Sequence, residues 1–151
     1  MKNFLIVLLG PTGVGKTDIS VDIARHFNCE IISADSRQFF MEMSIGTALP
    51  TKLQLKTIRH HFIKFLSVKD YYSSSLFERD VLELLPELFS KNNIVLMSGG
   101  SGLYIDAVCI GIDDIPDVDP FIREKYLARY REEGIEGLRS SLKILDPEHF
   151  S

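Results

Sequence analysis

The chain opens with the apolar run Phe4-Leu5-Ile6-Val7-Leu8-Leu9 and passes directly into Gly10-Pro11-Thr12-Gly13-Val14-Gly15-Lys16-Thr17. The second segment fits the phosphate-loop pattern of a glycine, four variable residues and then Gly-Lys-Thr. A helical pattern follows it, with Ile19, Ile23 and Phe27 on one face. A buried strand, this loop and a helix in that order predict a site for a di- or triphosphate.

The residue types of the loop suit phosphate chemistry. Its glycines allow a tight turn in which several backbone N–H groups point at phosphate oxygens, and the helix adds the positive end of its dipole. Lys16 supplies a mobile positive charge, and the hydroxyl of Thr17 can ligate a Mg²⁺ that bridges the phosphates. We therefore predict that residues 10–17 bind the phosphates, with Thr17 as metal ligand and Mg²⁺ as cofactor.

The composition sets few limits on function. The 151 residues are 45% hydrophobic and 25% charged, which is ordinary for a globular protein, and the net charge of −4 gives no global sign of nucleic-acid binding. Cys29 and Cys109 lie far apart without metal-ligand spacing, as expected in a reducing compartment. The first apolar run is too short to span a membrane and lacks a cleavage pattern. We expect a cytoplasmic protein that does not enter a membrane.

Strand and helix patterns alternate over the first hundred residues. This alternation predicts an α/β fold, a P-loop NTPase-like doubly wound parallel sheet. Pro86 should kink or divide the helix that contains it. We expect strands at 4–9, 29–33, 61–65 and 94–97, helices at 16–27, 74–89 and 103–108, and a loop at 47–53.

The character of the chain changes after residue 111. Residues 111–120 are acidic and punctuated by proline, which indicates a linker, and helical patterns follow at 121–133 and 135–145. We predict two parts: an α/β core over 1–112 that lacks its C-terminal strands, and the linker with the start of an α-helical insertion subdomain over 113–151.

Two further loops should meet the phosphate loop at the carboxyl edge of the sheet, where ligands bind in open α/β folds. Asp35, in the loop 34–38, is either a general base or metal-associated carboxylate, or the acceptor of a local turn or helix cap. The segment Ser98-Gly99-Gly100-Ser101-Gly102 either offers N–H groups and a hydroxyl to a ligand, or is a strand-to-helix turn.

Other polar and aromatic pairs are weaker signals. His60 and His61 are adjacent, so their side chains diverge, and packing or exposure is favoured over a metal site. Aromatic pairs at 39–40 and 71–72 could stack on a base or lie half-buried. The basic residues of the first helix after the linker either contact a phosphate backbone or form a solvated face: Arg123, Lys125, Arg129 and Arg131.

Taken together, these segments resemble the N-terminal half of the tRNA dimethylallyltransferase (tRNA isopentenyltransferase) family. The phosphate loop alone is shared with many unrelated NTPases, whereas the ordered set is far more specific. Besides residues 10–17 it comprises Ile32-Ser33-Ala34-Asp35-Ser36-Arg37-Gln38, Ile45-Gly46-Thr47-Ala48-Leu49-Pro50, His60-His61-Phe62, Ser98-Gly99-Gly100-Ser101-Gly102-Leu103-Tyr104 and Asp119-Pro120-Phe121-Ile122-Arg123.

The resemblance implies transfer of a dimethylallyl group from dimethylallyl diphosphate to N6 of the adenosine adjacent to the anticodon of tRNA, with release of diphosphate. It implies Asp35, Lys16 and Ser101 as catalytic residues, and a monomer as the working state. The tRNA contacts it implies are Asp35, Ser36, Arg37, Gln38, Ser101 and Arg123.

Two departures from the family and two other functions bear on this interpretation. Leu49 stands where relatives commonly have lysine, and relatives are about twice as long. We therefore expect this chain alone to bind diphosphate weakly and to transfer little of the dimethylallyl group.

Two other functions would use the same loop. A small-molecule or nucleotide kinase would bind ATP there, with Asp35 as the base toward a hydroxyl. A phosphate-binding module without catalysis would also fit the loop.

Overall fold

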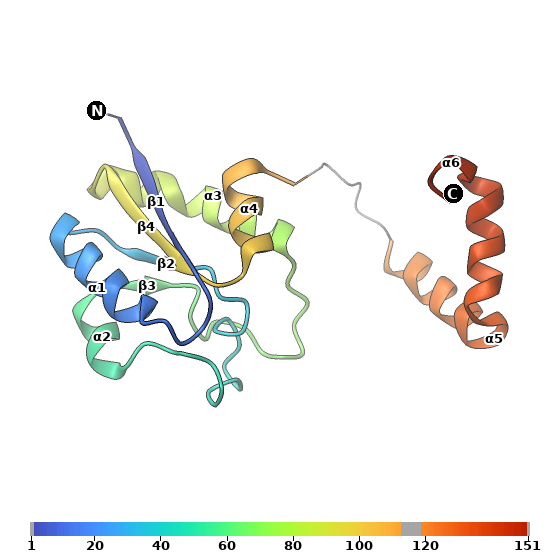
Figure 1. Cartoon of the computed structure of the whole chain (residues 1–151), viewed down its shortest axis with the longest axis horizontal. Coiled ribbons are helices and arrows are strands. Elements are labelled where there is room, and N and C mark those ends of the chain that lie inside the picture. The colour runs from blue at the N-terminus through green and yellow to red at the C-terminus, as the bar shows by residue number, and fades with distance from the viewer. Residues whose placement is uncertain (1, 113–118, 151) are drawn as a thin grey trace. The chain divides into compact units, whose positions relative to one another are not determined.

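The computed structural model describes residues 2–112 and 119–150. The chain divides into two compact units, Met1–Ile112 and Asp113–Ser151, of which the first is an α/β unit and the second is helical (Figure 1). The elements of the first unit are β1 Phe4–Leu9, α1 Lys16–Phe27, β2 Ile31–Ser33, α2 Lys52–Thr57, β3 His60–His61, α3 Ser74–Lys91, β4 Ile94–Gly99 and α4 Gly102–Ile110. Those of the second are α5 Pro120–Leu145 and α6 Pro147–Phe150.

The four strands form one parallel sheet in the order β1-β4-β2-β3. β4 thus lies between the first two strands of the sequence, and its register places Gly99 opposite Leu9 and Ser98 opposite Ser33. Because all strands run the same way, the three loops that follow β1, β2 and β4 leave the sheet at one edge. The predicted parallel α/β fold is confirmed.

Alternate strand residues face two separate cores. Ile31 of β2 and Leu96 of β4 pack with Val21 and Ala24 of α1. Their neighbours along the strands, such as Ile32 and Met97, pack on the other face, against α3 and α4. This period of two is what a strand covered on both faces requires. Helices therefore cover both faces of the sheet (Figure 1), and the edge from which the three loops leave lies between these helical layers.

β1 departs from the expectation of a strand buried on both faces. It pairs with β4 along one edge, and it is the outermost strand in the part of the chain that the structure describes. Phe4, Val7 and Leu9 are exposed as a result. An apolar run predicts a strand correctly here but overestimates its burial.

An aromatic cluster fills the core beneath α3 and α4. Phe39 is fully buried and stacks on Phe77, with ring centroids 5.3 Å apart. Tyr72 meets the same ring edge-on, and its hydroxyl donates to Asp80 at 2.8 Å. The alternative in which Phe39 and Tyr72 stack on a base is therefore wrong, whereas Tyr71 is exposed.

Several helix predictions need correction. The loop expected at 47–53 ends early: its last two residues, 52 and 53, begin α2, which continues to Thr57 because Thr51 and Gln54 make a capping box at its start. Pro86 does not divide α3, which runs unbroken from its cap at Ser73 to Lys91. The third strand holds only residues 60–61.

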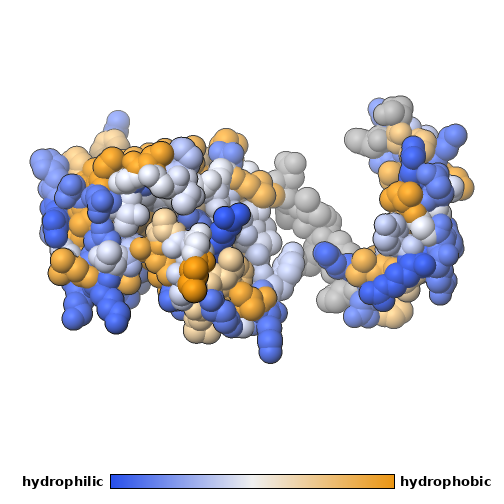
Figure 2. Space-filling view, turned by 60° about the horizontal axis from the view of Figure 1, so that its bottom comes forward, coloured by the Kyte–Doolittle hydropathy of each residue, from blue (hydrophilic) through white to orange (hydrophobic). Residues whose placement is uncertain are grey.

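The second unit follows the predicted pair of helices. The torsions of Gly134, φ 68° and ψ −167°, break α5 between the two predicted segments. Hydrophobic side chains interrupt the hydrophilic surface of this unit (Figure 2), and Phe121, Ile135 and Leu145 are among the exposed ones. The middle of the predicted linker, residues 113–118, lies outside the described residues.

Glu30, just before β2, lies beside three basic side chains at the end of the sheet away from the loops. Its carboxylate lies 2.6 Å from His61 Nε2, 3.4 Å from Lys91 Nζ and 3.7 Å from Arg59 Nε. Burial raises the pKa of Glu30, but the hydrogen bond and charge of His61, together with Lys91, lower that pKa more. The folded pKa is therefore below the usual glutamate value.

Because the folded pKa is lowered, ionised Glu30 stabilises the fold above the unfolded pKa, and this stabilisation is lost as the pH falls through the folded pKa. We expect Glu30→Gln to lower the free energy of unfolding by about 1 kcal/mol at pH 7. The difference from wild type should shrink below about pH 4, near the usual glutamate value. Urea titrations across this range measure it, with the exposed Glu83→Gln as control. A difference independent of pH would contradict the assignment.

Candidate functional site

The phosphate loop has the backbone geometry that its glycines predict. Gly13 and Gly15 have φ of 87° and 85°, in the left-handed region that side chains disfavour, and Gly15 is the residue from which α1 begins. The ammonium of Lys16 folds back and donates to the carbonyl of Pro11. The loop thus places the first turn of α1 and one lysine around the space where an anion would sit.

Hydrogen bonds join the other two loops at the same edge. The Ala34 N–H donates to Ser98 O at 2.8 Å, and the Ser101 N–H donates to Ala34 O at 3.2 Å. The Ser101 hydroxyl accepts from the Ser36 N–H at 3.0 Å and donates to the Ser36 hydroxyl at 3.1 Å. These bonds join the loops after β2 and β4, and Ser101 fixes the segment that carries Asp35.

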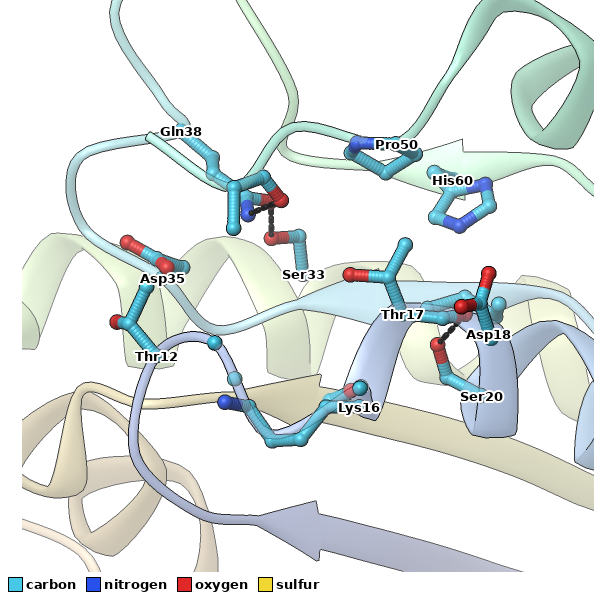
Figure 3. Close-up of a pocket in the computed structure, with 16 residues that line it drawn as sticks. Thr12, Lys16, Thr17, Asp18, Ser20, Ser33, Asp35, Gln38, Pro50 and His60 are labelled. Atoms are coloured by element: carbon cyan, nitrogen blue, oxygen red, sulfur yellow. Dashed lines mark hydrogen bonds between the residues drawn. The ribbon is translucent and has the colours of Figure 1, made fainter. Parts of the chain in front are cut away.

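The phosphate loop and the end of β2 enclose a cavity of about 210 Å³. In Figure 3, Thr12 and Asp35 lie at one end of this cavity, while Thr17 and Asp18 lie at the other. Five loop residues and eleven others line it: Thr12, Gly13, Gly15, Lys16, Thr17, Asp18, Ser20, Ile31, Ser33, Asp35, Gln38, Ala48, Pro50, His60, Ser98 and Gly99.

Asp35 makes the predicted local turn bond and also lies at the cavity, so its chemical role stays a prediction. Its Oδ1 accepts from the Arg37 N–H at 3.1 Å, which is a local turn bond. The half-buried carboxylate also lines the cavity. The turn bond occupies Oδ1 and therefore does not by itself exclude a chemical role for the carboxylate.

Gln38 is buried, and both the oxygen and the nitrogen of its side-chain amide make hydrogen bonds. Ser33 Oγ donates to its Oε1 at 2.9 Å, and its Nε2 donates to the carbonyl of Ala48 at 2.9 Å. The second bond brings residues 48–50 over the cavity as a wall. In this arrangement Gln38 shapes the cavity, and its predicted contact with tRNA stays a prediction.

A second tie fixes that wall to α1. Gln54, the partner of Thr51 in the capping box of α2, donates to Asp18 Oδ1 at 2.6 Å. Sequence reasoning missed Asp18, Ala48, Pro50 and His60 as lining residues, because their approach depends on this tie and on the pairing of β3 with β2. The family segments at 45–50 and 60–62 contain Ala48, Pro50 and His60, whereas no motif pointed to Asp18.

The remaining predicted residues lie outside the lining. Ser36, Arg37 and Ser101 flank the cavity at the loop edge, and Arg123 belongs to α5 in the second unit. The described residues contain no group of three or more histidine, cysteine, aspartate or glutamate side chains that could hold a metal ion. No helix within the described ranges is long and apolar enough to cross a bilayer.

Comparison with known proteins gives a consistent result. The family model described as IPP transferase matches residues 38–151. A protein of Porphyromonas gingivalis named tRNA dimethylallyltransferase 2 is 56% identical over 147 residues, which are 97% of this chain and 49% of that protein. The tRNA dimethylallyltransferase of Christiangramia forsetii is 52% identical over 150 residues, covering 99% of this chain and 50% of that protein. This chain spans about half the length of these relatives.

Solved structures agree with the fold. The full-length tRNA isopentenylpyrophosphate transferase of Bacillus halodurans is 31% identical with a TM-score of 0.72, over 99% of this chain and 50% of that one. A eukaryotic dimethylallyltransferase acting on tRNA has a TM-score of 0.77 at 23% identity, over 99% of this chain and 37% of that one. At this identity the similarity concerns the fold alone.

Proposed function

This chain belongs to the IPP transferase family, and on that premise we propose that it is the diphosphate-binding half of an enzyme that prenylates tRNA. The reaction would move a dimethylallyl group from dimethylallyl diphosphate to N6 of the adenosine adjacent to the anticodon. One observation carries the proposal: a phosphate loop and a half-buried carboxylate, Asp35, line the same cavity.

The loop would bind the leaving group. As the bond between the allylic carbon and the diphosphate oxygen breaks, negative charge builds on the diphosphate. Backbone N–H groups at the start of α1 and the Lys16 ammonium would offset that charge. Among the residues that the structure describes, the Lys16 ammonium donates to one carbonyl, that of Pro11 in its own loop, and a diphosphate could replace this acceptor.

The residues at the Thr17 end of the cavity fit a magnesium ion. The Thr17 hydroxyl and the Asp18 carboxylate supply hard oxygen donors there, and Mg²⁺ combines few protein oxygens with phosphate oxygens and water. When bound, Mg²⁺ would neutralise charge on the diphosphate. We assign Thr17 as the direct ligand.

Asp35 would act on the acceptor. N6 attacks the allylic carbon, the bond from carbon to diphosphate oxygen breaks, and N6 passes a proton to the Asp35 carboxylate. Oδ1 already accepts from Arg37, so we assign the proton to Oδ2. The adenosine must leave its stack to reach this cavity, and Ser36, Arg37 and Arg123 are the residues we propose to contact the tRNA.

A product assay tests the proposal. The 151-residue chain, and a chimera lengthened with the second half of the Porphyromonas gingivalis relative, are each given dimethylallyl diphosphate with an anticodon stem-loop, or ATP with small hydroxyl acceptors. N6-prenylated adenosine from the chimera would support the proposal. A phosphorylated product would instead identify a kinase, and binding without turnover by the chimera would identify a phosphate-binding module.

Asp35→Asn should lower the rate of transfer by the chimera about a hundredfold, because the amide cannot accept the N6 proton. Affinity for dimethylallyl diphosphate should stay near that of wild type, since the amide oxygen can still accept the turn bond from Arg37. Single-turnover rates and calorimetric titrations measure the two quantities separately. Equal transfer by variant and parent would remove Asp35 from the mechanism.

A further inference from the structure

His60 lines the cavity, and only one of its two ring nitrogens has a hydrogen-bond partner among the described residues. Its Nδ1 lies 2.9 Å from the carbonyl oxygen of Ile58. Its Nε2 is buried and has no hydrogen-bond partner among the described residues. A buried polar atom without a hydrogen-bond partner lowers the stability of the folded protein. We therefore expect a bound group to supply the hydrogen bond that the described residues do not.

The partner of Nδ1 determines the chemistry of Nε2. A carbonyl oxygen can only accept, so Nδ1 carries the proton and Nε2 presents a lone pair. Burial lowers the pKa of His60, the bond to Ile58 raises that pKa, and the neighbouring His61 lowers it further, with a net fall. The ring is therefore neutral at physiological pH, and Nε2 is an acceptor.

The ring is directed toward the first turn of α1. In Figure 3 it lies across the cavity from Thr17 and Asp18, at the end opposite to Asp35. A fully ionised diphosphate offers only acceptor oxygens and cannot satisfy Nε2. Water molecules in the hydration shell of a Mg²⁺ are strong donors, and Mg²⁺ usually keeps several of them.

We propose that His60 is a positioning residue of the metal–diphosphate site, whose neutral Nε2 accepts a hydrogen bond from a water that the Mg²⁺ at Thr17 holds. This inference rests on the proposed function, because it needs diphosphate and Mg²⁺ in this cavity. His60 would then orient the hydrated ion against the diphosphate without contacting either substrate. Partners of this kind around a metal typically change its affinity about ten- to a hundredfold.

Three variants of the 151-residue chain test the proposal by calorimetry with inorganic diphosphate, at increasing Mg²⁺. His60→Phe keeps a planar ring but removes the acceptor, and should raise the Mg²⁺ concentration needed for half-maximal binding about tenfold. His60→Gln can return an acceptor oxygen and should recover most of this loss. His26→Phe, on the exposed end of α1, makes the same exchange away from the cavity and should match wild type.

Nitrogen NMR of the imidazole provides a readout that does not depend on folding of the variants. In the wild type, the Nδ1 of His60 should stay protonated throughout, and the Nε2 signal should move only when Mg²⁺ and diphosphate are added together. Protonation of Nε2 on adding diphosphate would mean that His60 donates directly to the anion, and would overturn the proposal.

The outcomes separate the two levels of inference. Diphosphate binding with the same Mg²⁺ requirement in wild type and His60→Phe would overturn the role of His60 and leave the proposed function standing. Failure of both the wild-type chain and the lengthened chimera to bind diphosphate would overturn the proposed function, and the role of His60 with it.

Discussion

Replacing Lys16 by methionine should lower prenyl transfer by the lengthened chimera about a thousandfold. The charge that develops on the departing diphosphate is the largest electrostatic change in the reaction, and Lys16 is the only lysine or arginine among the residues that line the cavity. Methionine keeps the length and the apolar stem of the side chain. The change therefore removes the charge while leaving the packing of the loop nearly intact.

The comparison needs both a binding and a rate measurement. Dimethylallyl diphosphate should also bind the 151-residue Lys16→Met chain more weakly, because part of the charge is present before the bond breaks. Lys56→Met on the exposed face of α2 makes the same substitution outside the cavity and should leave both quantities unchanged. Transfer within a few-fold of the parent in Lys16→Met would show that the loop does not hold the leaving group.

The phosphate loop and its flanking elements could be predicted to the residue. β1 and α1 have the bounds that the apolar run and the Gly-Lys-Thr segment indicate, because both patterns depend only on neighbouring residues. α2 could not be predicted in this way, since it is six residues long, follows a proline and depends on the Thr51–Gln54 capping box. Short elements of this kind are decided by side-chain bonds that hydrophobic periodicity does not record.

The site was predictable where its residues follow strands directly. Asp35 lies just after β2, and Lys16 lies at the end of the phosphate loop that follows β1, so the parallel strands bring both to one edge. His60 and the wall at Ala48–Pro50 reach the cavity through long-range contacts: the pairing of Ile31 with His60, and the bond from Gln38 to Ala48. The two histidines are adjacent in the sequence, but in the fold His60 lines the cavity and His61 hydrogen-bonds to Glu30.

Gly99→Ala should destabilise the α/β unit by about 3 kcal/mol or more. A Cβ on Gly99 would lie 2.8 Å from the Cα of Ala34 and closer still to the carbonyl carbon and oxygen of that residue. These are backbone atoms, so no side chain can turn away to make room. Relief requires β2 and β4 to separate where Ser33 and Ser98 are in register, next to the bond from Ala34 to Ser98.

Gly102→Ala is the matched control for this effect. No heavy atom lies within 4 Å of the Cβ that alanine would add there, and Gly102 is the first residue of α4, where alanine favours the helix. Urea unfolding of both variants should therefore give a midpoint well below wild type for Gly99→Ala and an unchanged or slightly higher one for Gly102→Ala. Because the same contact fixes the peptide before Asp35, any folded Gly99→Ala protein should also bind dimethylallyl diphosphate less tightly. Identical midpoints for the two variants would mean that the loops after β2 and β4 do not approach each other this closely, and the geometry derived for the cavity would fail with them.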